Sequence, residues 1–347
     1  MKILKIVSIN FFIFLFLILV IELLFGYWFD KNNLGPYMRE HRMKKNPISV
    51  KFNNTNYNFT YKRNYYGFRG DEINLGEIKI VLIGGSTADE RYKPYEYTIT
   101  GLLNQRLEKD INKKIINAGI EGQSTRGHIF NFEKWFPKLQ GFNPNYFIFY
   151  IGMNDHLKDP NDNDEKTIIG HVANPSITEL VSDNIKSRSL LYDYIRKIKH
   201  KYYINKQKTV SYDFDIGIKN YTKKGFDFLT YDNAIKIYNI PNLKNENKDK
   251  IKTYLENIDK LVNLVAKYKA KPIFINQLAH DGNHNKTLFI LNYSLIEHCK
   301  KKKYFCIDLA KSLNGKKDYW WDGVHTTPTG SQEIVKIIYP KLLEFLK

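Results

Sequence analysis

The stretch KIVLIGGSTADE, residues 79–90, decides the fold. Its first half is a continuous apolar run, which is typical of a strand buried on both faces of a parallel sheet. Two glycines then allow a sharp turn, and Ser86 follows at once. The carboxyl ends of strands are where open α/β sheets bind ligands. The stretch therefore predicts a parallel sheet with an accessible hydroxyl at its edge.

The rest of the chain repeats the pattern of apolar run and helix. The clearest helix pattern is residues 250–268, where apolar side chains recur on one helical face. The stretch from Ser331 repeats this pattern, and Pro340 is a candidate kink. Alternating strands and helices predict an open, doubly wound sheet. The five predicted strands are residues 78–84, 114–119, 146–152, 271–277 and 304–309.

Two regions fall outside this alternation. Residues 30–75 are rich in aromatic residues and asparagine and show no clear period. Residues 157–249 separate the third and fourth strands and are too long for a plain loop, so they are a candidate lid or partner surface. We expect a transmembrane anchor at 1–29, an entry segment at 30–75, and an α/β domain at 76–347 with the insertion 157–249.

The N-terminus predicts a membrane anchor. Residues 6–29 form an apolar stretch long enough to cross a bilayer as one helix. A cleaved signal peptide would have a shorter stretch and small residues at its cleavage site. Here Tyr27 and Trp28 suit the membrane interface, and Glu22 lies close enough to that end to reach the headgroups. We expect the chain to contact the membrane through residues 6–29.

The sequence gives a weaker indication of how the protein is oriented in the membrane. Basic residues follow the anchor, so the positive-inside rule does not favour an exported domain, although long domains translocate regardless of charge. We expect a single-pass protein whose main domain is extracytoplasmic, in the periplasm. The basic residues concerned are Lys31, Arg39, Arg42, Lys44 and Lys45.

The net charge and the two cysteines say less about function than the strand pattern does. The formal net charge is +18, but the lysines are spread along the chain, which favours a solvated basic surface over a nucleic-acid site. We expect no nucleic-acid partner. Cys299 and Cys306 are too few for a disulfide-built fold and lack the spacing of a zinc finger. They could pair in an exported domain or remain ordinary thiols, and the sequence leaves both open.

A serine hydroxyl becomes a nucleophile when a histidine takes its proton. In DGVH, Asp322 precedes His325 by three residues, a spacing that lets the carboxylate hold the imidazole as a base. A second pair, Asp281 and His284 in DGNH, has the same spacing and also follows a strand. Spacing alone cannot choose between them. The pair His280 and His284 is a weak metal signal, and this loop is kept as a secondary candidate for substrate contact.

A serine esterase also needs donors for the oxyanion of its tetrahedral intermediate. Gly122 follows the second predicted strand, where its bare backbone N–H can approach a ligand. Asn154 follows the third strand and carries a side-chain amide. Taken alone, such residues usually only turn the chain or cap a helix. Four suitable elements at four strand ends indicate a site.

Together these motifs resemble the SGNH or GDSL-type hydrolases. GGST stands at the family's serine block, GIEGQST at its glycine block, GMND at its G-x-N-D block and DGVH at its D-x-x-H block. Order and spacing agree over residues 78–346, apart from the insertion. The departure is the serine block, where Gly85 replaces aspartate and Thr87 replaces leucine.

The resemblance implies a flavodoxin-like three-layer α/β/α fold with a five-stranded parallel sheet. It implies a catalytic triad of Ser86, Asp322 and His325. It implies an oxyanion hole from the N–H groups of Ser86 and Gly122 and the amide of Asn154. No metal or organic cofactor is implied. Residues 64–73, NYYGFRGDEI, also resemble the entry of membrane-associated relatives from bacterial envelope or polysaccharide contexts.

Some nearby residues have plainer interpretations. We expect Asp155 to be a structural hydrogen-bond partner rather than a second acid. Trp320 and Trp321 flank the histidine loop, where core packing is at least as good an explanation as stacking on a sugar. Arg69 is expected to form an ion pair within the entry segment rather than to bind substrate.

The hypothesis is a membrane-anchored serine esterase that removes short acyl groups, O-acetyl above all, from an envelope carbohydrate or other ester through an acyl-enzyme. The alternatives are an O-acyltransferase that uses the same triad on a polysaccharide, a catalytically silent glycan-binding protein, and a nucleotide-binding module. The last leaves Asn154 and the Asp322–His325 pair unexplained, and no GK signature follows Ser86. The sequence specifies no protein partner.

Overall fold

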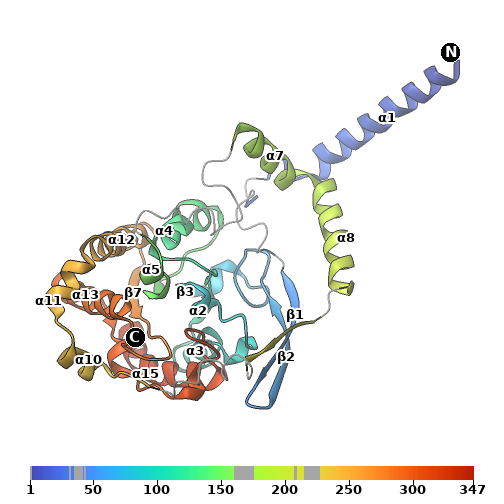
Figure 1. Cartoon of the computed structure of the whole chain (residues 1–347). Helices are drawn as coiled ribbons and strands as arrows, with labels where there is room; N and C mark the ends of the chain where they lie inside the picture. Colours follow the sequence, from blue (N-terminus) through green and yellow to red (C-terminus); the bar gives the residue numbers. More distant parts are fainter. Residues whose placement is uncertain are drawn as a thin grey trace.

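The computed structural model describes residues 2–30, 33–34, 42, 44–159, 176–206, 209–214 and 227–347. Lys31 and Arg39, which follow the predicted anchor, lie outside the described residues, as does most of the acidic start of the insertion. Figure 1 shows an α/β unit from which the N-terminal helix α1 (Lys2–Phe25) projects as a separate rod.

The α/β unit is built on five parallel strands in the order β4-β3-β5-β7-β8. The sequence correctly predicted all five strands and their parallel arrangement. The order is that of a flavodoxin-like sheet, whose direction of winding reverses between β3 and β5. The bounds are β3 (Ile78–Gly84), β4 (Lys114–Asn117), β5 (Tyr146–Ile151), β7 (Lys271–Asn276) and β8 (Cys306–Ile307).

The fifth strand is much shorter than the predicted 304–309. Lys303 ends the preceding helix in the left-handed conformation, and the chain then has only a few residues before the next helix starts. Asp308 caps that helix, since its side chain accepts a hydrogen bond from the N–H of Lys311. The cap stops β8 at Ile307, because a capping residue begins the turn of the helix.

Helices cover both faces of the sheet. Val81 and Ile83 of β3 pack in the core under α4, α12 and α13, whereas Ile80 and Leu82 pack under α3 and α15. Both faces are therefore buried, which explains the continuous apolar run in the sequence. These helices are α3 (Ile99–Ile111), α4 (Thr125–Lys134), α12 (Lys248–Ala266), α13 (Lys286–Lys302) and α15 (Pro328–Leu346), which continues through Pro340.

A second, smaller sheet has the order β2-β1-β6. β1 and β2 form an antiparallel hairpin in the entry segment, turned by Asn53 and Asn54 with positive φ, as a tight two-residue hairpin requires. β6 comes from the insertion and pairs with β1 in parallel. The sheet therefore joins two segments that are far apart in the sequence. The bounds are β1 (Lys45–Phe52), β2 (Thr55–Lys62) and β6 (Val210–Asp213).

The remaining helices are short or belong to the insertion. They are α2 (Ser86–Asp89), α5 (Met153–Leu157), α7 (Ile177–Arg188), α8 (Leu190–Lys206), α10 (Tyr231–Ile237), α11 (Ile240–Glu246) and α14 (Leu309–Ser312).

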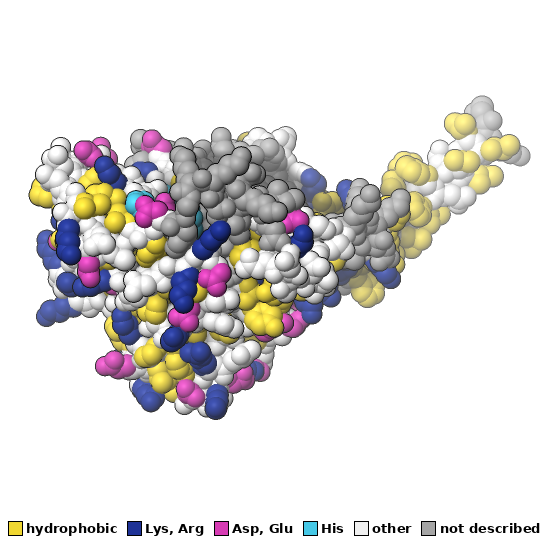
Figure 2. Space-filling model, turned by 60° about the horizontal axis from the view of Figure 1, so that its bottom comes forward, with side chains coloured by type: hydrophobic (Ala, Val, Ile, Leu, Met, Phe, Trp, Pro, Cys, Tyr) yellow, Lys and Arg dark blue, Asp and Glu magenta, His cyan; other side chains and the backbone are white. Residues whose placement is uncertain are grey.

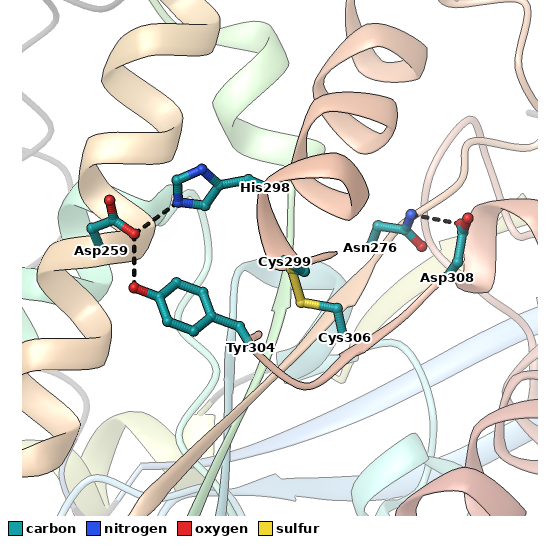
Figure 3. The surroundings of a disulfide bond; sticks show 7 residues. All are labelled: Asp259, Asn276, His298, Cys299, Tyr304, Cys306 and Asp308. Carbon is teal, nitrogen blue, oxygen red and sulfur yellow. Dashed lines mark hydrogen bonds and ion pairs between the residues drawn. A yellow bond between two sulfur atoms is a disulfide. The ribbon is translucent and has the colours of Figure 1, made fainter. Parts of the chain in front are cut away.

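The two cysteines form a disulfide (Figure 3). It joins Cys299, near the end of α13, to Cys306, the first residue of β8, across a Cα–Cα distance of 6.2 Å. Beside it, Asp259 of α12 accepts hydrogen bonds from His298 at 2.7 Å and Tyr304 at 3.0 Å. Of the two possibilities that the sequence left open, the structure has the paired form.

α1 is the one candidate membrane span among the described residues. Ile3–Phe25 is long and apolar enough to cross a membrane, and none of this stretch is buried against the protein. A signal sequence near an N-terminus would have the same properties. Figure 2 shows its hydrophobic side chains along the projecting rod, whereas the visible face of the domain carries scattered lysines and arginines mixed with acidic residues.

Candidate active site

Ser86 is the first residue of α2, directly after β3. It is partly exposed, whereas Thr87, Ala88 and Asp89 behind it are buried. The preceding Gly85 is a close-packed position, because a Cβ there would clash with the Asn154 amide and lie 3.1 Å from the Gln123 carbonyl oxygen. In this chain a larger side chain before the serine would displace the Asn154 amide.

Asp322 and His325 form the pair that the DGVH spacing predicted. The His325 Nδ1–H donates to Asp322 Oδ2 at 2.8 Å. Asp322 Oδ1 accepts the backbone N–H groups of Val324 and His325, each at 2.8 Å. Burial opposes ionisation of Asp322, but these hydrogen bonds outweigh it and hold the pKa of that carboxyl below its usual range. The pair is therefore a fixed, ionised carboxylate against an imidazole.

The second ring nitrogen of His325 is available for chemistry. His325 Nε2 is buried and has no hydrogen-bond partner among the described residues. An ionised carboxylate can only accept, so in the neutral ring the proton sits on Nδ1 and Nε2 has the lone pair. Ser86 makes no hydrogen bond to Nε2 in this structure. Such bonds are often long in a ligand-free enzyme and tighten only when substrate binds.

A buried polar network ties the serine segment to the histidine loop. Lys93 Nζ donates to Glu90 Oε1 at 2.8 Å, to Thr326 Oγ1 at 3.0 Å and to Ser331 Oγ at 2.5 Å. Ser331 in turn donates to Glu90 at 2.6 Å. Burial lowers the pKa of Lys93 to about 8, against the opposing effect of Glu90. Glu90 lies four residues after Ser86 and Thr326 directly follows His325, so the network fixes these two loops against each other.

The proposed oxyanion donors occupy neighbouring strand ends. Gly122 has φ +78°, and nothing lies within 4 Å of where its Cβ would be, so its backbone borders open space. Asn154 Nδ2 donates one hydrogen to the Gln123 carbonyl oxygen at 2.7 Å, which fixes the amide and leaves its second hydrogen outside that bond. The Gln123 side chain is itself held by His128 and Asn131.

Ser86, Gly122 and Asn154 each follow the carboxyl end of a strand in the five-stranded sheet. Ser86 follows β3 and Asn154 follows β5, so they flank the point where the sheet reverses its winding. Open α/β sheets bind their ligands in the crevice at this point. Gly122 comes after β4, and Asp322 and His325 lie between β8 and α15.

The competing DGNH pair does not form. His284 Nε2 lies 3.0 Å from Asp227 Oδ2, and the buried Asp281 Oδ1 has no hydrogen-bond partner among the described residues. This loop touches the site in another way, because the N–H of His280 donates to the Gly323 carbonyl oxygen at 3.0 Å. It therefore braces the DGVH loop.

Asp155 and the two tryptophans have the structural roles that we expected, whereas Arg69 does not. Asp155 is a structural partner, as expected, because it accepts from the Thr125 N–H at 3.0 Å and the Thr125 hydroxyl at 2.6 Å. Trp320 and Trp321 are both buried, with Trp321 edge-on to Phe52, which confirms core packing. The expected ion pair of Arg69 within the entry segment is wrong. Its guanidinium donates to the backbone carbonyls of Asp89 and Lys93, which are neutral acceptors.

Sequence reasoning missed the buried cluster behind Ser86. Arg63 from the entry segment pairs with Asp89 at 2.7 Å and also donates to the Gly119 carbonyl oxygen. The Tyr61 hydroxyl donates to Asp89 at 2.8 Å. Burial raises the pKa of Asp89, but Arg63 and Arg69 outweigh it and lower that pKa overall. The cluster fixes α2, and no local motif indicates it because Tyr61 and Arg63 lie 26 or more residues from Asp89.

An aromatic cluster stands beside His325. The ring of Tyr92 is 5.2 Å from the imidazole and 4.9 Å from Tyr212, and Phe214 stacks on Trp321 at 5.3 Å. Tyr212 lies in β6 and Phe214 follows it, so the insertion reaches the site. The sequence offered no signal for this contact, because it depends on the pairing of β6 with β1.

A flavodoxin-like sheet with a strand-end serine and a histidine–aspartate pair defines the class of α/β serine hydrolases. The sequence profile described as "GDSL-like Lipase/Acylhydrolase" matches residues 80–338, well over half of the chain, and the protein belongs to this SGNH/GDSL family. It is a serine ester hydrolase. A search of curated proteins found no match.

Solved structures include similar folds at low sequence identity. The psychrotrophic esterase EstA from Pseudoalteromonas sp. is 12% identical, with a TM-score of 0.44, over 77% of this chain and 98% of that one. A catalytic mutant of Axe2, an acetylxylan esterase from Geobacillus stearothermophilus, is 11% identical, with a TM-score of 0.40, over 76% and 93%. TesA is 11% identical, with a TM-score of 0.44, over 76% and 97%.

Proposed function

We propose that Ser86, His325 and Asp322 form the catalytic triad of this hydrolase. The observation that carries the proposal is the His325–Asp322 hydrogen bond, which leaves the buried Nε2 without a partner among the described residues. His325 Nε2 takes the hydroxyl proton as Ser86 Oγ attacks the ester carbonyl carbon. Asp322 keeps the imidazole in the correct tautomer and stabilises the imidazolium that forms.

The tetrahedral intermediate then requires donors for its oxyanion. We assign this role to the N–H groups of Ser86 and Gly122 and to the Asn154 side-chain amide. Collapse expels the alcohol, which takes the proton from His325 and leaves an acyl group on Ser86 Oγ. A water molecule, deprotonated by His325, attacks this acyl-enzyme, and the carboxylic acid leaves while Ser86 recovers its proton.

The surroundings of the triad favour a short acyl group on a carbohydrate. Gly85, Gln123 and Asn154 are closely packed, whereas Gly122 borders open space, and we place the acyl group on the side of Gly122. The alcohol departs on the side of His325, because that residue protonates it. Tyr92 lies next to His325 and Tyr212 lies next to Tyr92, and aromatic faces stack well on sugar rings. We propose O-acetyl groups of an envelope glycan as substrate.

We also propose that α1 anchors the enzyme to a membrane with the hydrolase domain on the extracytoplasmic, periplasmic side. The Cys299–Cys306 disulfide suits an oxidising compartment. We keep the division into an anchor at 1–29, an entry segment at 30–75 and a hydrolase domain at 76–347 with its insertion at 157–249. In the folded chain the entry segment supplies Tyr61 and Arg63 to the cluster behind Ser86.

A substrate series tests the proposal. The full chain in detergent is offered p-nitrophenyl esters of increasing acyl length, together with an acetylated oligosaccharide. We expect kcat/KM to be highest for acetate and acetate to be released from the oligosaccharide. A preference for long acyl chains would refute the short-acyl assignment. Acetyl transfer to an added glycan without release of acetate would identify a transferase instead.

A further inference from the structure

Helix α8 of the insertion carries an exposed apolar stripe. Five residues spaced i, i+3, i+4, i+7 and i+11 fall on one face, the arrangement of an amphipathic helix. Each is between 48% and 62% exposed. The residues are Leu191, Tyr194, Ile195, Ile198 and Tyr202. Contiguous exposed apolar surface of this kind marks an interaction site.

The other sides of α8 are polar. Lys199 and Lys201 are exposed and flank the stripe on its two sides. Asp193 and Arg196 lie on the opposite side and line a cavity that Tyr27, just beyond α1, also lines. One face of α8 therefore meets the protein, and the apolar face points away from it. Basic flanks beside an apolar stripe are typical of a helix that lies in a membrane interface.

The start of α8 is fixed to the end of α1. Glu22 of α1 accepts hydrogen bonds from the N–H groups of Leu190 and Leu191 at 3.0 and 2.8 Å, and from the Ser189 hydroxyl at 2.8 Å. The carboxylate thus caps α8, where negative charge is favoured by the helix dipole. Figure 1 shows the two helices meeting at this point, away from the α/β unit. If α1 crosses a bilayer, α8 begins at its surface.

We infer that the apolar face of α8 lies on the headgroup layer of the membrane that holds α1. The inference rests on the membrane anchor proposed above and is independent of the triad. Leu191, Ile195 and Ile198 enter the boundary of the acyl chains, while Lys199 and Lys201 contact anionic lipid phosphates. The contact holds the hydrolase domain at the membrane surface in a fixed orientation rather than on a free tether.

A second copy of the chain is a less suitable partner for the apolar stripe of α8 than a membrane. A stable protein interface involves about 20–30 residues on each side. The stripe has five on a single helix that stands outside the α/β unit. The lysines would also repel one another in a symmetric pair, whereas an anionic bilayer complements them.

Site-specific fluorescence tests the inference. The described cysteines form a disulfide and none is free, so one introduced cysteine can be labelled selectively. Ile198→Cys carries an environment-sensitive NBD group in the full chain, reconstituted in phosphatidylcholine–phosphatidylglycerol vesicles with or without brominated lipid. Ile237→Cys, an exposed isoleucine of α10, is the matched control, and Leu17→Cys within α1 reports insertion of the anchor.

We expect the label at 198 to emit at shorter wavelength in vesicles and to lose most of its fluorescence to brominated lipid, while the label at 237 does neither. In a chain that also carries Ile195→Glu, the shift at 198 should largely disappear, with hydrolysis of a soluble ester unchanged. Quenching at 17 without quenching at 198 would overturn the inference and leave the anchor standing. No quenching at either position would overturn both. A blue shift in detergent that grows with protein concentration would instead assign the stripe to a second copy.

Discussion

The chain contains the pattern Asp-Gly-x-His twice, with different outcomes: DGNH at 281–284 follows β7, and DGVH at 322–325 lies between β8 and α15. In DGVH the aspartate bonds to the imidazole at 2.8 Å. In DGNH, Gly282 has φ +73° and its N–H closes a turn onto Ala279, while His284 meets Asp227 instead. The backbone between the two residues, not their spacing, decides whether a carboxylate and an imidazole meet.

The DGVH loop is supported by buried contacts, whereas the ion pair of the DGNH loop is exposed. The DGVH loop is fixed by the buried Glu90–Lys93 network and by the packing of Trp321. The His284–Asp227 pair is largely exposed, and its carboxylate is 81% accessible. Exposed pairs contribute little, whereas buried polar networks specify one geometry. The buried network supports the DGVH loop, to which we assign the catalytic base.

The largest expected effect separates the two histidines. His325→Ala removes the proposed base and should lower kcat for ester hydrolysis by roughly 10⁴-fold or more, with little change in KM. His284→Ala should retain activity within about twofold, because surface substitutions outside a site have small effects. Steady-state kinetics on p-nitrophenyl acetate measures both. Equal losses of kcat in the two variants would contradict the assignment of different roles to the two histidines.

The second largest effect on kcat should distinguish the two aspartates. Asp322→Asn keeps the size of the side chain but no longer orients the imidazole, and we expect a loss in kcat of roughly 10³-fold. Asp281→Asn, the matched change in the other loop, should leave kcat nearly unchanged. A near-normal kcat for Asp322→Asn, with the fold intact by circular dichroism, would remove Asp322 from the mechanism.

The buried Lys93–Glu90 ion pair that supports the histidine loop can be removed by substituting the lysine. Lys93→Met leaves Glu90 buried without its cation and should lower the free energy of unfolding by about 3–5 kcal/mol. The exposed pair Lys244–Glu297 provides the control, and Lys244→Met should cost no more than about 1 kcal/mol. Urea unfolding measures both. A double variant, Lys93→Met with Glu90→Gln, should recover part of the loss if the unpaired charge is its cause.

The smallest expected effect concerns pH. Because the pKa of Asp322 is lowered in the folded state, the folded protein binds fewer protons than the unfolded chain in the acid range. The resulting stability is present above the unfolded pKa, about 4, and is lost as the pH falls through the folded value. Asp322→Asn should therefore lose less stability than the parent as the pH falls below about 5. A parallel decline in the two proteins would contradict this assignment.

Much of the fold could be predicted because it depends on local patterns. Apolar runs such as 79–83 and the helical face of residues 250–268 encode a sheet covered on both sides, and the strand-end motifs marked Ser86 and Asn154. The entry hairpin was not predicted, since its strands form one sheet with β6 of the insertion. Long-range pairing of this kind leaves no period in the sequence.

The candidate site was predictable only in part, for the same reason. Ser86, Gly122, Asn154 and the DGVH pair belong to short motifs that the sequence displays. The supports that hold them do not, because Arg63 reaches Asp89, and Lys93 reaches Ser331, across long stretches of chain. The choice between DGVH and DGNH likewise needed the backbone geometry of Gly282, which neither spacing nor residue type reveals.

The most direct test of the account is covalent labelling of the serine. The full chain in detergent is treated with a fluorophosphonate, and the modified residue is found by mass spectrometry in the parent, Ser86→Ala, His325→Ala and His284→Ala proteins. We predict an adduct on Ser86 in the parent and in His284→Ala, and none at that residue in the other two. Folded parent protein without an adduct at Ser86, or labelling that survives His325→Ala but not His284→Ala, would contradict the account.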